Sequence, residues 1–172
     1  IHLNIGSNLK SKFGDRFENI SIAINLLINS KIKISNISSF YETPSYPNKK
    51  FPCFLNIGVT VNYSGNEMEL INIISLIEKK IGRIKSEKNA PRVCDIDIID
   101  FNGLIIEKNN LKIPHEKSHL RNFVLYPILE IDKNWSHPIL KKSVTFLINK
   151  LDQKSRIEIT RLNKNVIIKT WL

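Results

Sequence analysis

The alternation of apolar and polar residues predicts four strands and two helices in the first hundred residues of the chain. Residues 1–7 and 54–63 alternate with a period of two, which is typical of half-buried strands. Residues 15–30 and 66–81 carry apolar side chains at helical spacing. Residues 31–43 are predicted to be extended, and the stretch CDIDIIDF, residues 94–101, is predicted to be a further strand.

The resulting order, strand–helix–strand–strand–helix–strand, is the signature of a ferredoxin-like βαββαβ sandwich of the α+β class. In that fold two helices pack on one face of an antiparallel sheet. A short hairpin-like stretch is expected after Gly103. Extra C-terminal helices are predicted near 123–131 and 144–151, followed by a closing strand around 157–160.

Length and composition fit a single soluble domain spanning residues 1–172. The chain has 42% hydrophobic and 24% charged residues and shows no repeat or linker, although no role is assigned to the tail, residues 162–172. A run of about 18 apolar residues is absent, and no basic-then-apolar leader precedes the first strand. Cys53 and Cys94 match no C-x-x-C spacing, so we expect free thiols and a cytoplasmic location.

The formal charge of +10 indicates a polyanionic partner, namely nucleic acid, an acidic membrane surface or a phosphorylated ligand. Much of this charge is lysine, which the compositional bias of an A/T-rich genome would also produce, so the six arginines are more informative. The six glycines form neither G-x-G-x-x-G nor a P-loop. If the protein handles a nucleotide, side chains must therefore hold its phosphates.

Two carboxylates form a candidate metal site. Asp95 and Asp97 are two residues apart on a predicted strand, so both project from one face, about 7 Å apart at the backbone. With neither His nor Cys beside it, such a pair favours Mg²⁺ over zinc, although a solvated D-x-D pair is the alternative. Asp100 has the opposite parity and is expected to face away. A zinc pair of His115 and His119 would lack the glutamate of H-E-x-x-H.

Cationic residues stand close to this pair in the sequence. Arg92 precedes it by three residues, and Arg83 follows the predicted helix end at Gly82. His115 and Arg121 add two more cationic groups downstream. A forked guanidinium matches phosphate oxygens in two places, so arginines beside Mg²⁺-binding aspartates are typical of phosphoryl or diphosphoryl transfer. The alternative for each arginine is an ordinary surface cation.

Several motifs resemble one enzyme family. They lie between I-G-S-N (5–8) and about residue 150, and they are SSFYETP (38–44), FLN (54–56), APRVCDIDI (90–98) and PHEKSHLRNFVLYPI (114–128). Together they resemble monofunctional bacterial-type 6-hydroxymethyl-7,8-dihydropterin pyrophosphokinase of the folate pathway. The family fold is a ferredoxin-like sandwich. Its reaction moves the β,γ-diphosphate of ATP as a unit onto the pterin hydroxymethyl group and releases AMP.

The resemblance implies a role for individual residues. Asp95 and Asp97 would bind two Mg²⁺ ions and, with Arg83 and Arg92, form the catalytic group. ATP would be held by Glu78, Arg83, Lys85, Arg92, Ile98, His115 and Arg121. The pterin would lie between Phe54 and Phe123, and its polar edge would be read by Asn56 and by groups at Thr43 and Pro44.

The loop after Gly82 departs from the best-known bacterial pattern, in which a second arginine and a Trp-Gly pair precede Pro-Arg. Here Lys85, Lys88, Asn89 and Ala90 occupy the region. Lys85, or alternatively Lys88, is expected to stand in for the arginine without its two-pronged contact. The loops at 44–53 and 83–92 are predicted to close over ATP and pterin and to exclude water.

The alternative function is a basic ferredoxin-like module that binds nucleic acid without catalysis. The RNP-like string of aromatic residues that it requires does not occur, and it would leave Asp95 and Asp97 unexplained. Ester hydrolysis on the same fold would leave the two aromatic residues and Asn56 unexplained. We therefore expect small-molecule partners only, no nucleic acid, no membrane and a monomer.

Overall fold

The computed structural model describes residues 1–84, 90–108 and 111–168. Within them a six-stranded antiparallel sheet has the order β5-β1-β4-β3-β8, with β2 paired to β4. Its strands are β1 (His2–Ser7), β2 (Lys33–Ile37), β3 (Phe40–Thr43), β4 (Phe54–Asn62), β5 (Asp95–Asp100) and β8 (Thr160–Leu162). A separate two-stranded sheet contains β6 (Ile106–Lys108) and β7 (Leu111–Ile113).

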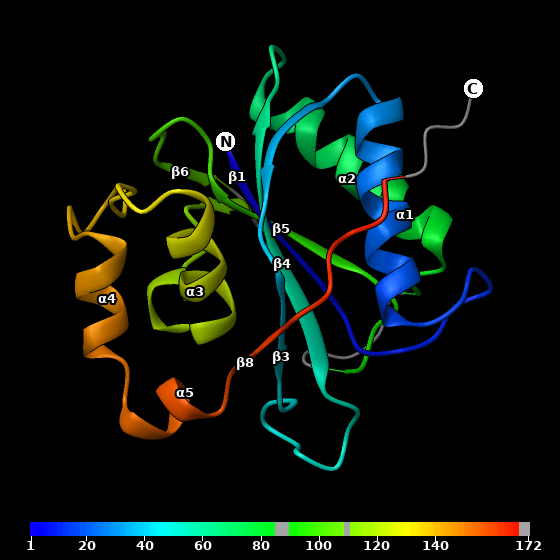
Figure 1. The fold of residues 1–172 in the computed structure, drawn as a ribbon. Coiled ribbons are helices and arrows are strands. Elements are labelled where there is room, and N and C mark those ends of the chain that lie inside the picture. Colours follow the sequence, from blue (N-terminus) through cyan, green and yellow to red (C-terminus); the bar gives the residue numbers. More distant parts are fainter. Residues whose placement is uncertain (85–89, 109–110, 169–172) are drawn as a thin grey trace.

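Helices cover both faces of the large sheet (Figure 1). The pair α1 (Arg16–Asn29) and α2 (Glu67–Ile81) packs on one face, as the predicted sandwich requires. The opposite face carries α3 (Asn122–Ile131), with α4 (Val144–Lys150) packed behind it. The remaining short helices are η1 (Ser118–Leu120) and α5 (Gln153–Ile157). The ferredoxin-like α+β fold is thus confirmed, and the extra C-terminal helices form its second covering layer.

Local sequence explains where the first two helices begin and end. The side chains of Asp15 and Asn66 each accept at least one hydrogen bond from a backbone N–H group of the first helical turn, and Glu18 and Glu69 complete the two capping boxes. Gly82 ends α2 with a φ of +112°, a left-handed conformation that favours glycine. The predicted helix at 66–81 is therefore confirmed to within a residue at each end.

The two faces of β4 are both buried, for different reasons. Leu55, Ile57, Val59 and Val61 point into the core beneath α1 and α2, as their alternation predicts. The half-buried strand that the alternation predicts would leave the other, polar face exposed, but α3 covers most of it. A Cβ atom at Gly58 would lie 2.9 Å from the Cβ of Pro127, so the glycine allows the helix to approach closely.

Strand β1 lies between the strands that carry the candidate site. Gly6 stands opposite Asn56 of β4 on one side and opposite Asp95 of β5 on the other. Asn4 stands in the same way between Gly58 and Asp97. The hydrogen-bond register of three strands therefore fixes the spacing of these positions.

A register shift between β1 and β5, with one extra residue in β5, overturns the expected orientation of Asp100. The pairing of β1 with β5 shifts between His2 and Leu3, which breaks the simple parity of the strand. Asp100 is buried and accepts a hydrogen bond from Trp135 Nε1 at 2.8 Å. Because Trp135 belongs to the apolar cluster around α3, Asp100 turns toward the face that Asp97 also uses, at the far end of the strand.

The C-terminal segment differs from the sequence expectation. The closing strand lies at Thr160–Leu162 and pairs with β3, whereas 153–157 forms α5. The described part of the tail runs along α1 in Figure 1, and Lys164 Nζ lies 3.7 Å from the ring centre of Phe17. Among the described residues, no helix has the length and apolar character needed to cross a membrane.

Candidate active site

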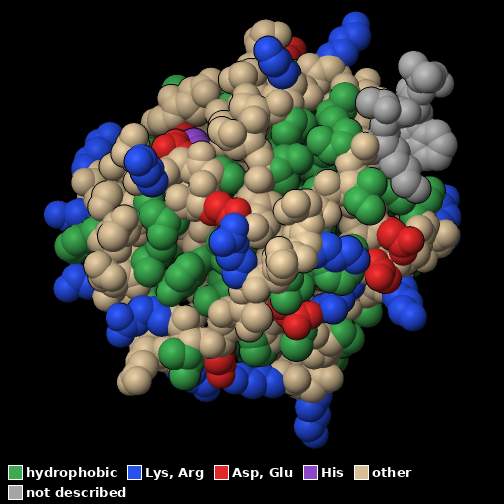
Figure 2. All heavy atoms as spheres, viewed as in Figure 1, with side chains coloured by type: hydrophobic (Ala, Val, Ile, Leu, Met, Phe, Trp, Pro, Cys, Tyr) green, Lys and Arg blue, Asp and Glu red, His purple; other side chains and the backbone are tan. Residues whose placement is uncertain are grey.

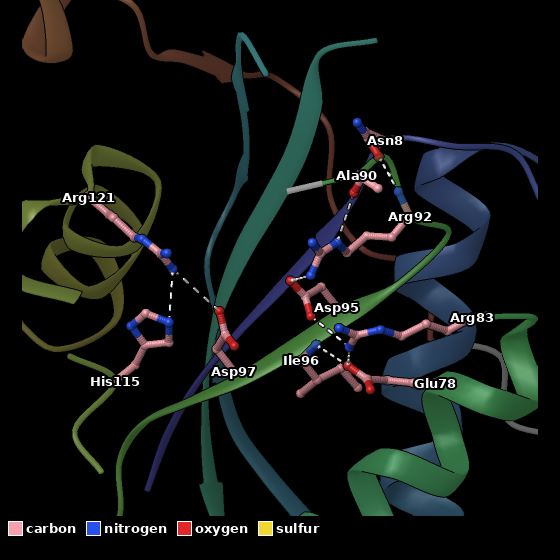
Figure 3. A network of polar contacts seen from close by, with 10 residues as sticks. All are labelled: Asn8, Glu78, Arg83, Ala90, Arg92, Asp95, Ile96, Asp97, His115 and Arg121. Atoms are coloured by element: carbon pink, nitrogen blue, oxygen red, sulfur yellow. Dashed lines mark hydrogen bonds and ion pairs between the residues drawn. The ribbon is translucent and has the colours of Figure 1, made fainter. Parts of the chain in front are cut away.

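The two strand aspartates meet three of the six arginines (Figure 3). Asp95 Oδ1 lies 2.7 Å from Arg83 Nη1, and its Oδ2 lies 2.9 Å from Arg92 Nη1. Asp97 Oδ2 lies 3.8 Å from Arg121 Nη1. The end of α2, the segment before β5 and the start of α3 each supply one arginine, so the fold assembles the cationic groups that the sequence singled out.

Glu78 lies behind Arg83. The carboxylate is ion-paired with Arg83, and its Oε1 accepts a hydrogen bond from the Ile96 backbone N at 2.8 Å. The residue is 8% exposed. Burial raises its pKa, while the charge of Arg83 and the Ile96 hydrogen bond oppose that shift. In this structure Glu78 orients Arg83, and its contact with ATP stays a prediction.

His115 and Arg121 present donors to the same region. The Lys117 backbone N donates to His115 Nδ1 at 3.1 Å, which leaves the proton of a neutral ring on Nε2. Arg121 Nη1 lies 3.2 Å from that Nε2. Burial, followed by the charge of Arg121, lowers the pKa of His115, so the ring is neutral at pH 7. Because both nitrogens are then donors, they do not hydrogen-bond to each other, and the pair is suited to sharing a phosphate oxygen as acceptor.

The carboxylate pair has the chemistry of a magnesium site. Burial, followed by repulsion from Asp95, raises the pKa of Asp97, and Arg121 offsets this only in part. A divalent cation would stabilise the ionised form. Among the described residues, no group of three His, Cys, Asp or Glu side chains is placed to hold a metal. Two carboxylates suffice for Mg²⁺, which takes its other ligands from phosphates and water, so these residues fit that ion.

The histidine pair considered for zinc is not assembled as a site. The His119 ring packs edge-on against the His137 ring, with centres 5.5 Å apart. His115 instead faces Arg121. The two histidines at i and i+4 therefore have different surroundings.

The predicted pterin residues lie on the sheet face beneath α3. Asn56 is 2% exposed, and its Nδ2 has no hydrogen-bond partner among the described residues. Leaving a buried amide donor unpaired costs about 1–3 kcal/mol, which favours a ligand acceptor at this point. A Cβ at Gly6 would lie 2.8 Å from Asn56 Oδ1, so glycine leaves room for the amide. Phe54 is half-buried and stands opposite Thr43 in the register of β3 and β4.

The start of α3 carries the second predicted aromatic residue. Phe123 is half-buried, and the Arg121 guanidinium lies 5.4 Å from its ring centre. With its amide nitrogen directed toward α3, Asn4 donates to the Phe123 carbonyl at 2.9 Å and to the Ile57 carbonyl at 3.3 Å. Asn4 therefore ties the first turn of α3 to the sheet. Sequence analysis missed it, although Asn4 is one of the polar residues that alternate with Leu3 and Ile5 in this strand.

Asn8 was quoted in the I-G-S-N motif without a role, and it joins the two loops beside the site. The Arg92 backbone N donates to Asn8 Oδ1 at 2.7 Å, and the Asn8 backbone N donates to the Arg92 carbonyl at 3.1 Å. Asn8 Nδ2 donates to Ser45 Oγ at 3.2 Å and to the Pro52 carbonyl at 3.1 Å. One side chain thus holds both the 44–53 loop and the segment before β5.

For two of the predicted ATP residues, Lys85 and Ile98, the structure does not place the side chain beside the site. Lys85 lies outside the described residues, as do its loop neighbours Lys88 and Asn89. The Ile98 side chain is buried in the core beneath α1 and α2, so a contact with ATP would have to come from its backbone. Within the described residues β5 pairs only with β1 in the large sheet, which leaves one edge of its backbone for such a contact.

Residues 2–133 match the family model of 7,8-dihydro-6-hydroxymethylpterin-pyrophosphokinase. The chain is 36% identical over 142 residues to the 2-amino-4-hydroxy-6-hydroxymethyldihydropteridine pyrophosphokinase of Aquifex aeolicus, covering 83% of this chain and 86% of that protein. It is 37% identical over 140 residues to the folic acid synthesis protein FOL1 of Dictyostelium discoideum, covering 81% of this chain but only 20% of that protein.

Solved structures with the same fold include the HPPK-DHPS protein of Plasmodium falciparum crystallised with pteroate. The TM-score is 0.74 at 16% sequence identity, and the match covers 93% of this chain and 47% of that one. At this identity the likeness concerns the fold alone. The chain thus spans about half of this solved protein and a fifth of the Dictyostelium relative.

Proposed function

The chain belongs to the 7,8-dihydro-6-hydroxymethylpterin-pyrophosphokinase family, and from this premise we propose that it transfers the β,γ-diphosphate of ATP to 6-hydroxymethyl-7,8-dihydropterin. The products are the pterin diphosphate and AMP, within tetrahydrofolate synthesis. The observation that carries the proposal is the meeting of Arg83, Arg92 and Arg121 around Asp95 and Asp97. Diphosphoryl transfer needs little covalent chemistry from the protein, so positioning and charge do most of the work.

On the ATP side, the arginines and His115 bind phosphate oxygens. Glu78 orients Arg83 from behind, and Asp95 orients Arg83 and Arg92 from the sheet. Asp95 and Asp97 would hold the two proposed Mg²⁺ ions. When bound, these ions would supply charge neutralisation on the transferred group and a lower pKa for the attacking hydroxyl. The outer backbone edge of β5 at Ile98, together with Lys85, contacts the rest of ATP.

On the pterin side, the ring lies between Phe54 and Phe123. The buried Nδ2 of Asn56 donates to an acceptor on the pterin edge, and backbone groups at Thr43 and Pro44 complete the recognition. An apolar slot with a few fixed polar groups suits a flat heterocycle with a polar edge. Asn8 is hydrogen-bonded to the loops on both sides of the site. Closure of these loops over the substrates excludes water, which would otherwise compete with the pterin as acceptor of the diphosphate.

The remaining parts of the proposal are a single domain over residues 1–172, a monomer, a cytoplasmic location and no nucleic-acid partner. Figure 2 shows lysine and arginine side chains spread around the visible face and not gathered into one stripe. A nucleic-acid-binding module would be expected to present a continuous basic surface.

The decisive experiment incubates the protein with ATP, Mg²⁺ and 6-hydroxymethyl-7,8-dihydropterin and separates the nucleotides. We expect AMP without ADP, and no AMP after chelation of Mg²⁺. Arg92→Lys should lose most of the turnover because lysine lacks the forked contact. Its matched control is Arg156→Lys, since Arg156 forms no ion pair with a described residue. ADP as the product, or no nucleotide turnover, would contradict the proposal.

Loop closure has its own test. Calorimetry of the pterin with and without a non-hydrolysable ATP analogue and Mg²⁺ should show tighter binding in the ternary complex. Pterin binding that is indifferent to the nucleotide would remove the closure step.

A further inference from the structure

A cluster of four side chains joins three elements at the C-terminal end of α3. We call Ser39, Tyr41, Glu130 and Arg161 the Glu130 clamp. Glu130 Oε1 accepts hydrogen bonds from Ser39 N at 3.0 Å, Ser39 Oγ at 2.9 Å and Arg161 Nη2 at 3.0 Å. Its Oε2 accepts from the Tyr41 hydroxyl at 2.7 Å, and Arg161 Nε donates to Ser39 Oγ at 3.0 Å. Among the described residues, no hydrogen bond or ion pair joins the clamp to Arg83, Arg92 or Arg121.

The clamp connects the two elements that carry the walls of the pterin slot. Tyr41 stands directly opposite Asn56 in the register of β3 and β4, and Thr43 follows it opposite Phe54. Glu130 is on the last turn of α3, whose first turn carries Phe123. In Figure 1, α3 lies against the sheet beside β3 and β4, with β8 at the sheet edge. Because α3 is short and rigid, fixing its C-terminal end to the sheet at Glu130 also restrains its N-terminal end, where Phe123 lies.

The charges of the clamp suit a permanent contact. Burial alone would raise the pKa of Glu130, but the hydrogen bonds from Tyr41 and Ser39 and the charge of Arg161 outweigh it and lower that pKa. Burial, followed by the hydrogen bond to Glu130, raises the pKa of Tyr41. The carboxylate therefore stays ionised and the phenol stays a donor. Hydrogen bonds to an ionised acceptor are about twice as strong as neutral ones.

We infer that Glu130 is a positioning residue for the pterin site, because it holds β3 and β8 to α3 and so sets Phe123 relative to Phe54 and Asn56. The inference rests on the proposed function. Of the three arginines proposed to bind ATP phosphates, Arg121 stands at the start of α3, whereas Arg83 and Arg92 lie on segments that the clamp does not touch. Because two of the three arginines stay in place, loosening the clamp should weaken pterin binding more than ATP binding.

The test variant is Tyr41→Phe, which removes one hydroxyl and keeps the buried ring. We expect the KM for the pterin to rise roughly threefold to tenfold, which corresponds to one lost hydrogen bond, with kcat near that of the wild type. The Kd for ATP in the absence of pterin should change less than about twofold. The matched control is Tyr126→Phe on the same helix, because the Tyr126 hydroxyl makes no hydrogen bond with a described residue.

A double-mutant cycle separates the clamp from general stability. Glu130→Gln should raise the pterin KM in the same way, and adding Tyr41→Phe to it should have little further effect if both act through one carboxylate. Arg161→Gln removes only the β8 arm and gives a smaller rise in the same direction, and it serves as the measurement if another variant fails to fold.

Two outcomes would overturn the inference. If Tyr41→Phe lowers the Tm but leaves the pterin KM unchanged, the clamp stabilises the fold without setting the slot. If pterin and ATP affinities fall equally, it does not act on the pterin side. A wild-type protein that forms no AMP and binds no pterin would instead refute the proposed function and this inference with it.

Discussion

Replacing Gly58 with alanine tests whether the close packing of α3 on the sheet determines the active-site geometry. The new Cβ would lie 2.9 Å from the Cβ of Pro127, 3.1 Å from the Pro127 carbonyl carbon and 3.2 Å from Ile131 Cδ1. Carbon atoms pack at about 3.5–4.0 Å, so the helix must move away by roughly 0.5–1 Å. Two of the three contacts are to proline atoms that cannot swing aside, and the shift therefore falls on α3 itself.

The expected cost follows from packing. Overpacking costs about 1–3 kcal/mol, and the reduced flexibility of the unfolded chain offsets about 0.4–1 kcal/mol of that. A net loss of about 1–2 kcal/mol lowers the Tm by roughly 2–8 °C in a chain of this size. The same shift moves Phe123 and Arg121 at the start of α3. A displacement near 1 Å can cost up to about a hundredfold in rate, so we expect kcat/KM for the pterin to fall at least about tenfold.

The assay combines thermal unfolding with steady-state kinetics in both substrates. Gly103→Ala is the control, because Gly103 has a φ of +76° and its added Cβ would meet no atom within 4 Å. That variant strains the backbone by about 1–2 kcal/mol without pressing on α3. Its Tm should decrease by a similar amount to that of Gly58→Ala, while its KM for the pterin should remain that of the wild type. If Gly58→Ala keeps its Tm, or if both variants show the same pterin kinetics, the packing argument is wrong.

Three further predictions concern other parts of the molecule. Asp97→Asn should reduce AMP formation by at least about a hundredfold, because a charge that stabilises the reaction is lost. The Tm of the ligand-free variant at neutral pH should stay the same or rise, because burial already raises the pKa of the Asp97 carboxyl. An active variant would contradict the metal assignment. Burial, followed by the charge of His119, lowers the pKa of His137. The unfolded chain therefore binds more protons than the folded protein, and the Tm should fall as the pH drops below about 6.5. His137→Asn should make the dependence of Tm on pH less steep, and an unchanged dependence would contradict the argument. A thiol reagent should label the exposed Cys53 in the native protein and reach Cys94, which is buried and has a raised pKa, only after denaturation; equal native rates would contradict this.

The parts of the fold predicted correctly are those set by neighbours in sequence. The alternation in β4 places its apolar side chains in the core, and the capping residues fix where α1 and α2 begin. Asp95 and Asp97 share a face because parity holds over two residues. Each of these features depends on contacts within one turn or one strand, where a pattern in the sequence is reliable.

The features missed depend on contacts between distant segments. The predicted orientation of Asp100 is wrong because a bulge interrupts the pairing of β5 with β1. The sequence of neither strand alone predicts that bulge. The second face of β4 carries no apolar run, since glycine leaves the space and α3 supplies the cover. Glu130 and Tyr41 are 89 residues apart, so nothing in either local sequence announces their contact.

Gly6 pairs with Asn56 on one side and with Asp95 on the other, so the sheet fixes the distance between the two proposed substrate sites. Neighbouring strands are about 4.8 Å apart, so the amide proposed to read the pterin and the carboxylate proposed to hold the metal are about two strand spacings from each other. Backbone hydrogen bonds set this length, and the loops do not. The sequence between Arg83 and Arg92 can therefore change during evolution, provided that these two arginines remain, while the distance from diphosphate donor to acceptor stays constant.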